Sequence, residues 1–256
     1  MTDFEGSIIE PLLPNKPSGM PRVDDRKVLN GIYWRLRTGS PWAEIPERYG
    51  PPTTCYNCLV RWRRLGVWDR VFDAITAANG RKRGGAAEAP AGGEPDTGCM
   101  GRSRGDLTTK IHAMVDAEGR PITLALTLGR AHDGRSAAGL LDRIRKGSIL
   151  LADRAYDVDW LRDMVATRGG WANIKPMPTR KRIPSFSPFL YRFRNIAERF
   201  FNKIRRFRAI ATRFEKHAET YLALVKFAAV QIWLRRYESV AQGVRGDRLP
   251  ASTRFA

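Results

Sequence analysis

The sequence predicts an α/β protein in which a small all-helical domain, similar to a helix-turn-helix module, precedes a core of mixed strands and helices. Residues 25–78 contain short helical segments separated by joints of proline and glycine, which favours such a module. Residues 107–128 contain two β-prone runs around a glycine-containing turn, which favours an antiparallel hairpin. Residues 148–153 are a short apolar run ending in an acid, and helical patterns surround them, so strands and helices mix in the second part.

The composition is that of a globular protein with a large positive charge. Of 256 residues, 43% are hydrophobic, which is enough for one sizeable core with a smaller module or for two modest domains. The formal net charge is +19, and 35 arginines stand against 10 lysines. Because the planar guanidinium suits bidentate phosphate contacts, the balance favours a polyanionic partner, with nucleic acid first and an acidic membrane surface second.

The start of the chain lacks the basic and apolar segments of a signal peptide, and no apolar run approaches the roughly 20 residues of a membrane span. We therefore expect a soluble, cytoplasmic protein. The three cysteines are Cys55, Cys58 and Cys99, an odd number that does not indicate a disulfide framework. Cys55 and Cys58 form a C-x-x-C pair, but Cys99 and His112 lack the spacing of further zinc ligands, so helix packing is the favoured interpretation.

The helical domain is expected over residues 1–78. The sequence predicts helical segments over 24–40, 40–50 and 53–76. Ser40 can cap a helix, Pro41 suits a first helical position, and the Gly50–Pro52 stretch marks a break.

The third helical segment carries alternating basic and aromatic residues. Arg61, Arg63 and Arg64 interleave with Trp62 and Trp68. The arginines fit a helix that faces DNA phosphates, and the tryptophans equally fit a core with solvated arginines between them. Both interpretations stay open, because charge alone gives no readout of base sequence.

A flexible linker of glycine, alanine, proline and charged residues is predicted over 79–106. The core is predicted over 107–240, and a basic tail over 241–256. The core opens with the antiparallel hairpin of 107–128. The sequence then predicts, in order, a helix over 133–145, a strand over 148–152, a helix over 158–169, an irregular basic loop over 171–188 and two helices within 190–238.

Asp153 and Glu198 are the two acids with specialised surroundings. Asp153 ends an apolar strand and leads into a helical connection, where open α/β sheets gather ligands and catalytic groups. A plain helix cap or turn explains the same position equally well.

Glu198 lies in a basic helix whose two faces differ. Its own face carries Arg194, Glu198, Asn202 and Arg205, and the opposite face carries Ile196, Phe200, Ile204 and Phe207. Arginines on this face would hold phosphates, while Glu198 with Asp153 would hold Mg²⁺, which prefers carboxylate oxygens, water and phosphate. The alternative is a solvated face with an Arg194–Glu198 ion pair.

Several ordered blocks carry a resemblance to a known family. They are "GIYWRLRTGSPWAEIPERYGPPTTCYN", "TGCMGRSRGDLTTKIHAMVDAEGRPITLALTLG", "ILLADRAYD" and "YRFRNIAERFFNKIRRFRAIATRFEKHAETYLALVKFAAVQIWLR". Over about nine-tenths of the chain the sequence resembles the DDE transposases of the bacterial insertion-sequence-five group. The resemblance implies an RNase H-like core, a carboxylate triad that binds two Mg²⁺ or Mn²⁺ ions, and a bacterial protein that joins the nucleoid when bound to DNA.

By this resemblance, Asp153 matches the second catalytic acid and Glu198 the third. Tyr191, Arg194 and Glu198 match the family's Tyr-x-x-Arg-x-x-x-Glu signature. Arg205 stands where the family usually has a lysine, which keeps the charge but changes its shape. The implied partners are the terminal inverted repeats of the element and target DNA, with a homo-oligomer on the DNA.

The first acid of the triad has no clear counterpart. The family carries it on the opening strand of the core, and this chain has neither an apolar strand nor a suitable acid between residues 74 and 99. Asp96 lies in a turn-like stretch, Asp106 replaces a usual glycine, and Asp116 lies in the hairpin turn. The sequence therefore predicts a transposase whose opening strand was lost by internal deletion.

Three functions follow from these observations. The first is DNA transposition with impaired phosphodiester cleavage and strand transfer, and the second is a non-catalytic DNA-binding protein that occupies element ends. An RNA-associated basic protein explains the charge but not the acids. His112, His132 and His217 lie near no nucleophile motif, so a serine hydrolase is not indicated. The residues expected to contact DNA are Tyr191, Arg194, Asn202, Arg205, Arg61, Arg63, Arg64, Arg180, Lys181 and Arg182.

Overall fold

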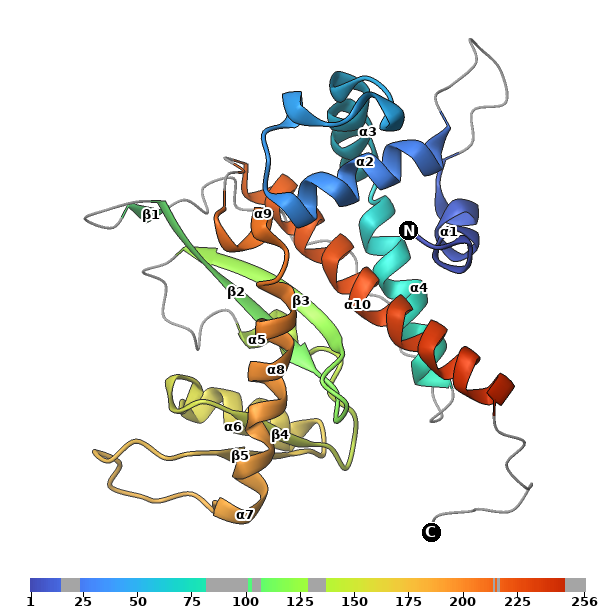
Figure 1. Ribbon diagram of the computed structural model, residues 1–256. Coiled ribbons are helices and arrows are strands. Elements are labelled where there is room, and N and C mark those ends of the chain that lie inside the picture. The colour runs from blue at the N-terminus through green and yellow to red at the C-terminus, as the bar shows by residue number, and fades with distance from the viewer. Residues whose placement is uncertain are drawn as a thin grey trace.

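The computed structural model describes residues 1–14, 24–81, 101–102, 107–128, 137–213, 215 and 217–246. It contains a helical part and two small sheets, joined by a long C-terminal helix (Figure 1). The helices are α1 (Asp3–Ile9), α2 (Asp25–Thr38), α3 (Pro52–Arg64), α4 (Val67–Arg81), α5 (Ala137–Leu141), α6 (Asp159–Thr167), α7 (Pro188–Tyr191), α8 (Asn195–Ile204), α9 (Arg208–Ala211) and α10 (Ala218–Gly246). Short 3₁₀ turns are η1 (Glu10–Leu12), η2 (Trp42–Glu44), η3 (Glu47–Tyr49), η5 (Arg154–Tyr156) and η6 (Arg192–Arg194). The strands are β1 (Gly101–Arg102), β2 (Leu107–Val115), β3 (Pro121–Leu128), β4 (Ile149–Ala152) and β5 (Trp171–Ile174).

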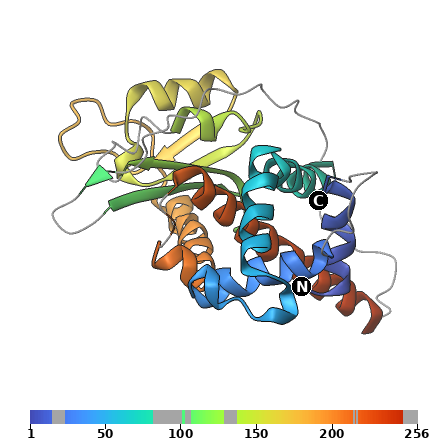
Figure 2. The same ribbon diagram turned by 90° about the horizontal axis from the view of Figure 1, so that it is seen from above.

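Helices α2, α3, α4 and α10 share one hydrophobic core (Figures 1 and 2). Trp62 and Trp68 are fully buried in it, with ring centroids 5.8 Å apart in an edge-to-face arrangement. The ring centroid of Phe227 in α10 lies 4.9 Å from that of Trp68. The tryptophans of α3 and α4 are therefore core residues, and Cys55 and Cys58 are buried beside them.

The segment predicted as a single helix over 53–76 is two helices. Gly66 lies between α3 and α4 with φ of +63°, a left-handed conformation that glycine adopts without steric cost. The segment predicted as a helix over 40–50 consists of η2 and η3. Proline precedes each of these 3₁₀ turns, at Pro41 and Pro46, and the Ser40 side chain caps neither of them.

The hairpin predicted over 107–128 is confirmed. β2 and β3 pair antiparallel from Thr109 opposite Leu128 to Val115 opposite Pro121, and β1 adds a two-residue edge at the start of β2. Asp116 closes the turn by accepting hydrogen bonds from the backbone N–H groups of Glu118 and Arg120.

The strand predicted before Asp153 is confirmed as β4, but the irregular loop predicted from 171 is wrong at its start. Residues Trp171–Ile174 form β5, which pairs in parallel with β4. Four residues are too few to show a strand period, and the strand forms because β4 offers a partner after the crossover through α6.

The segment over 190–238 differs from the predicted two helices. It contains α7, η6, α8 and α9 before α10 begins at Ala218. The last backbone hydrogen bond to α8 runs from the N–H of Phe207 to the carbonyl of Ile204, and Phe207, with an extended backbone, is the N-cap residue of α9. Within the described residues, no helix has the length and apolar character needed to cross a membrane.

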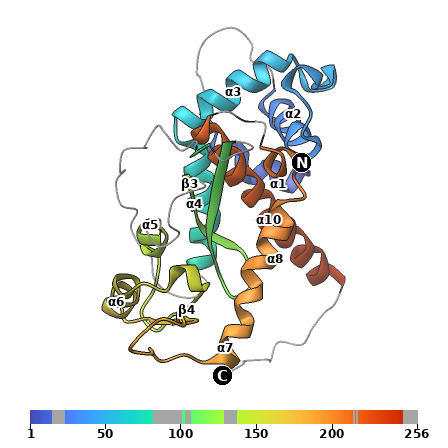
Figure 3. The ribbon, with the colours of Figure 1, turned by 90° about the vertical axis from the view of Figure 1, so that its left-hand side faces the viewer.

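The hairpin lies between α5 on one side and α8 with α10 on the other (Figure 3). β4, β5 and α6 form a second unit with its own small hydrophobic cluster. A cavity of about 1990 Å³ lies between β2 of the hairpin and β4 of this unit, with α5 and α8 contributing to its walls. The two sheets are therefore separate among the described residues, and a large space divides them.

Candidate metal and DNA-binding site

Asp153 follows the last residue of β4 and precedes η5. Its backbone is extended, and its carboxylate makes no capping hydrogen bond to the turn that follows. The side chain is 54% exposed. The carboxylate therefore does not cap the turn, and its ion-pair partner comes from another element.

Glu198 lies in the first turn of α8. The opposite face of this helix is anchored by Phe200 and Ile204, which are fully buried against the core. This arrangement confirms the two-faced pattern of the sequence and leaves the Glu198 carboxylate 55% exposed. The helix itself contacts β2 and α10, so the position of Glu198 is set by the core of the protein.

Arg194 joins these two acids. Its Nη1 lies 2.7 Å from Oδ1 of Asp153, and its Nη2 donates to Oε1 of Glu198 at 2.6 Å. Only a quarter of the Arg194 side chain is exposed. One guanidinium therefore holds carboxylates that come from a strand end and from a helix 45 residues further along the chain.

Tyr191 completes this cluster. The guanidinium of Arg194 lies 5.6 Å from the centroid of its ring, and Phe186 packs against the ring edge. Burial is the main cause that raises the pKa of Tyr191, and Arg194 opposes it. Burial also lowers the pKa of Arg194, but the carboxylates of Asp153 and Glu198 outweigh this effect and raise it overall. Arg194 is thus a fully charged group.

The same surface of α8 continues with Asn202 and with Arg205, which follows the helix. Both side chains are exposed. In the described part of the chain, neither has a hydrogen-bond or ion-pair partner, so both can contact an external phosphate. They extend the cluster of Asp153, Arg194 and Glu198 into a polar strip.

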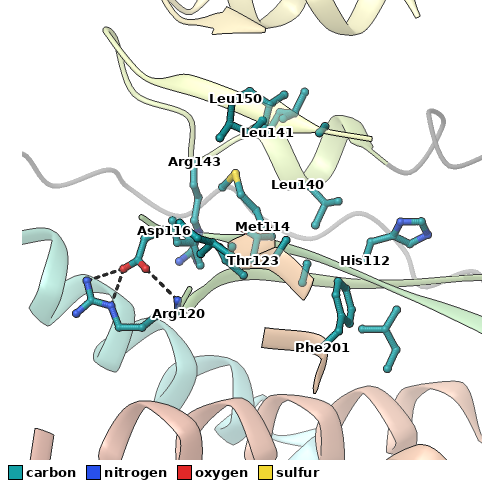
Figure 4. Close-up of a pocket in the computed structure, with 18 of the residues that line it drawn as sticks. His112, Met114, Asp116, Arg120, Thr123, Leu140, Leu141, Arg143, Leu150 and Phe201 are labelled. Atoms are coloured by element: carbon teal, nitrogen blue, oxygen red, sulfur yellow. Dashed lines mark hydrogen bonds and ion pairs between the residues drawn. The ribbon is translucent and has the colours of Figure 1, made fainter. Parts of the chain in front are cut away.

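A buried histidine links the hairpin to the segment after Asp153. His112 of β2 is buried, with Nδ1 2.7 Å from the hydroxyl of Tyr156 in η5 and Nε2 2.7 Å from the hydroxyl of Thr127 in β3. Figure 4 shows His112 and Met114 on the hairpin side of the cavity, and Leu150 of β4 on the other. No local pattern indicated this link, because the partners of His112 are 15 and 44 residues away in the chain.

Arg180 lies within the predicted basic loop and is committed to another site. Its Nε donates to Oδ2 of Asp157 at 2.7 Å, and its Nη1 donates to Asp159 at 2.5 Å. Asp157 has a fully buried side chain and also binds Arg162. Burial opposes ionisation of Asp157, but the hydrogen bonds from Arg180, the Met177 N–H and Arg162 outweigh it and lower its pKa.

The Asp157 network fixes the loop, and the cations that it leaves exposed are Lys175, Lys181 and Arg182. Asp157 lies in the sequence block "LADRAYD", four residues after Asp153. This position is the sequence feature from which its anchoring role could have been predicted.

The three arginines of α3 lie far from this cluster, at the opposite end of the molecule from α7 (Figure 1). Arg61 donates to Sγ of Cys58, and Arg63 pairs with Glu219 of α10 at 2.5 Å. Arg64 is exposed. The structure therefore does not bring the arginines of α3 together with Asp153 and Glu198.

Asp153 and Glu198 fit a hard divalent cation in ligand type, since Mg²⁺ is usually held by one or two carboxylates together with water and phosphate. In the part of the chain that is described, no three potential ligands gather into a metal site. Asp116 uses both carboxylate oxygens within its turn, where Oδ2 accepts from Arg120 Nε at 2.6 Å. Asp96 and Asp106 lie outside the described residues.

Two family models match the chain. Residues 1–72 match a family described as "Putative transposase of IS4/5 family", and residues 73–231 match the "Transposase DDE domain". No solved structure matches the chain. A domain of the second kind implies an RNase H-like fold, generally uses divalent metal ions and acts on DNA.

Related proteins carry similar descriptions. Half of this chain is 41% identical to the full length of a "Putative transposase for insertion sequence element IS6501" from Brucella ovis. A match of 28% identity covers 55% of this chain and 69% of a "Putative transposase for insertion sequence element IS402" from Burkholderia cepacia. The chain therefore belongs to the DDE transposase family of the IS4/5 group, whose function is DNA transposition.

Proposed function

We propose that this transposase binds the double-stranded ends of its element beside Asp153 and Glu198, and that these acids are the remaining ligands of a Mg²⁺ or Mn²⁺ site. The observation that carries the proposal is the convergence of the two carboxylates on one guanidinium, Arg194. Such a metal, when bound, supplies activation of a water or 3′-hydroxyl and stabilises the leaving oxygen. Asn202 and Arg205 would contact the DNA backbone, because they continue the same exposed strip.

The positive charge of the neighbouring loop supports DNA as the partner. Lys181 and Arg182 are exposed, and the Asp157 network holds their loop to the unit that carries Asp153. Phosphate contacts of this kind orient the duplex without reading its sequence. Arg180 would act by fixing the loop and not as a main phosphate contact.

Cleavage by this chain is proposed to be impaired. The cavity between β2 and β4 supports this proposal, because an additional strand paired with both would join the two sheets and bring a third acid beside Asp153. We propose that an internal deletion removed that strand. With only two carboxylates, one after β4 and one on α8, the nucleophile is held less well, and a misplacement of about 1 Å costs on the order of 100-fold in rate.

The test compares binding and nicking on one duplex that carries an end of the element. We expect DNA affinity to fall steeply with salt as counterions are released, and any residual Mn²⁺-dependent nicking to disappear in Asp153→Asn and in Glu198→Gln. Both variants should retain the DNA affinity of the unchanged protein, because removing a carboxylate does not weaken phosphate attraction. Nicking that persists in either variant would show that the two acids do not form the site.

The second candidate, a protein that occupies element ends without cutting them, is favoured by the same cavity. Salt-dependent binding with no nicking in Mg²⁺ or Mn²⁺ selects it. Robust cleavage by the unchanged chain would refute the proposed impairment.

A further inference from the structure

Arg194 occupies the position between the two acids that a cation would take. Each of its terminal nitrogens contacts a different carboxylate, at 2.7 Å for Asp153 and 2.6 Å for Glu198. Each of these charge-assisted contacts engages one oxygen of a carboxylate that a metal ion would also need. A second positive charge at the same place would also be repelled by the guanidinium.

We propose that Arg194 is an internal counter-ion that competes with the divalent metal for Asp153 and Glu198 in the DNA-free protein. This proposal rests on the proposed function of the two acids. Arg194 is then not a support of the metal site but a group that must release the carboxylates before a metal can bind both. The neighbouring ring of Tyr191 favours the present position of the guanidinium by facing it.

A direct measurement of Mn²⁺ binding tests the competition without any enzyme assay. Free Mn²⁺ is quantified by electron paramagnetic resonance while the full-length protein is titrated without DNA. Arg194→Gln removes two ion pairs between partly exposed groups, and it should bind Mn²⁺ about 2- to 30-fold more tightly than the unchanged protein, given the usual strength of such pairs. Arg194→Lys keeps a charge but cannot span both carboxylates with separate nitrogens, so its gain should be smaller.

Arg199→Gln is the matched control. Arg199 lies in α8 next to Glu198, is exposed, and makes no ion pair with any residue that the structure describes. Its removal changes the net charge equally but should alter Mn²⁺ affinity less than twofold, because exposed charges are well screened. In the double variant that combines Arg194→Gln with Glu198→Gln, the gain in Mn²⁺ affinity seen for Arg194→Gln alone should disappear.

An unchanged or weaker Mn²⁺ affinity in Arg194→Gln, with a native circular dichroism spectrum, would overturn the competition and make Arg194 a supporting group. If Arg199→Gln gains as much Mn²⁺ affinity as Arg194→Gln, the gain comes from the change in net charge and the proposal also fails. If the unchanged protein and every variant fail to bind Mn²⁺, both the competition and the proposed metal site are wrong. If the unchanged protein binds Mn²⁺ and Asp153→Asn abolishes this binding, the proposed metal site stands even where the competition fails.

Discussion

Replacement of Asp157 by asparagine should strongly weaken the unit formed by β4, β5 and α6. The Asp157 side chain has no exposed surface and accepts hydrogen bonds from Arg162 at 2.7 Å, from Arg180 at 2.7 Å and from the Met177 N–H at 2.7 Å. Removing one partner of a buried ion pair typically costs about 3–5 kcal/mol. Arg162 also donates to the carbonyls of Ala172 and Ile174, so its guanidinium stays partly satisfied and we expect the lower end, about 3 kcal/mol.

The matched control is Asp159→Asn. Asp159 pairs with the same Arg180, but its side chain is 78% exposed, so its removal should cost less than about 1 kcal/mol. The measurement is urea unfolding at pH 7 together with hydrogen exchange of the β4 and β5 amides. An equal loss in both variants, or no loss in Asp157→Asn, would refute the assignment of Asp157 as the anchor.

The pH dependence of the protein's stability follows from the same contacts of Asp157. The pKa of Asp157 is lowered in the folded protein, so its stabilisation is complete above the unfolded value of about 4 and is lost as the pH falls through the folded value. The unchanged protein should therefore lose stability below about pH 4 more steeply than Asp157→Asn. Parallel acid unfolding curves for the two proteins would contradict this expectation.

Two further substitutions test how the hairpin and α10 are held. Gly119→Ala should cost about 1–3 kcal/mol, because φ is +76° and the new Cβ would lie 3.1 Å from Ile196 of α8. Gly147 has a similar φ of +78°, but a Cβ built there would meet nothing within 4 Å. Thermal unfolding of Gly119→Ala and Gly147→Ala therefore separates backbone strain from side-chain contact. Equal losses of stability in the two variants would exclude a role for Ile196. Tyr221→Phe should cost about 1–3 kcal/mol, because the hydroxyl donates to the buried carbonyl of Ile210 at 2.9 Å. Burial raises the pKa of Tyr221 to about 12, so the unchanged protein should lose stability between about pH 10 and pH 12 in alkaline unfolding, and a similar loss in Tyr221→Phe would refute this origin.

Local patterns were sufficient to predict the elements that carry the two acids. An apolar run ending in Asp153 predicted β4, two β-prone runs around a glycine-containing turn predicted the hairpin, and the helical period of 195–204 placed Glu198 opposite Phe200. Each of these features depends on residues within a few positions of one another, where side-chain periodicity is a direct consequence of backbone geometry. The resemblance to DDE transposases added the family, which the comparisons confirm.

Only the tertiary structure decided which partners the charged groups take. The sequence favoured Arg180 as a DNA contact, but the fold places it on buried Asp157, 23 residues earlier in the chain. The sequence offered Arg194 a partner four residues away in Glu198, and the fold added Asp153 from the end of β4. β5 was missed for the same reason, since a four-residue strand is stabilised by its neighbour and not by its own pattern. Long-range pairing of charges and strands depends on where the core brings distant segments together, and local periodicity carries no information about that.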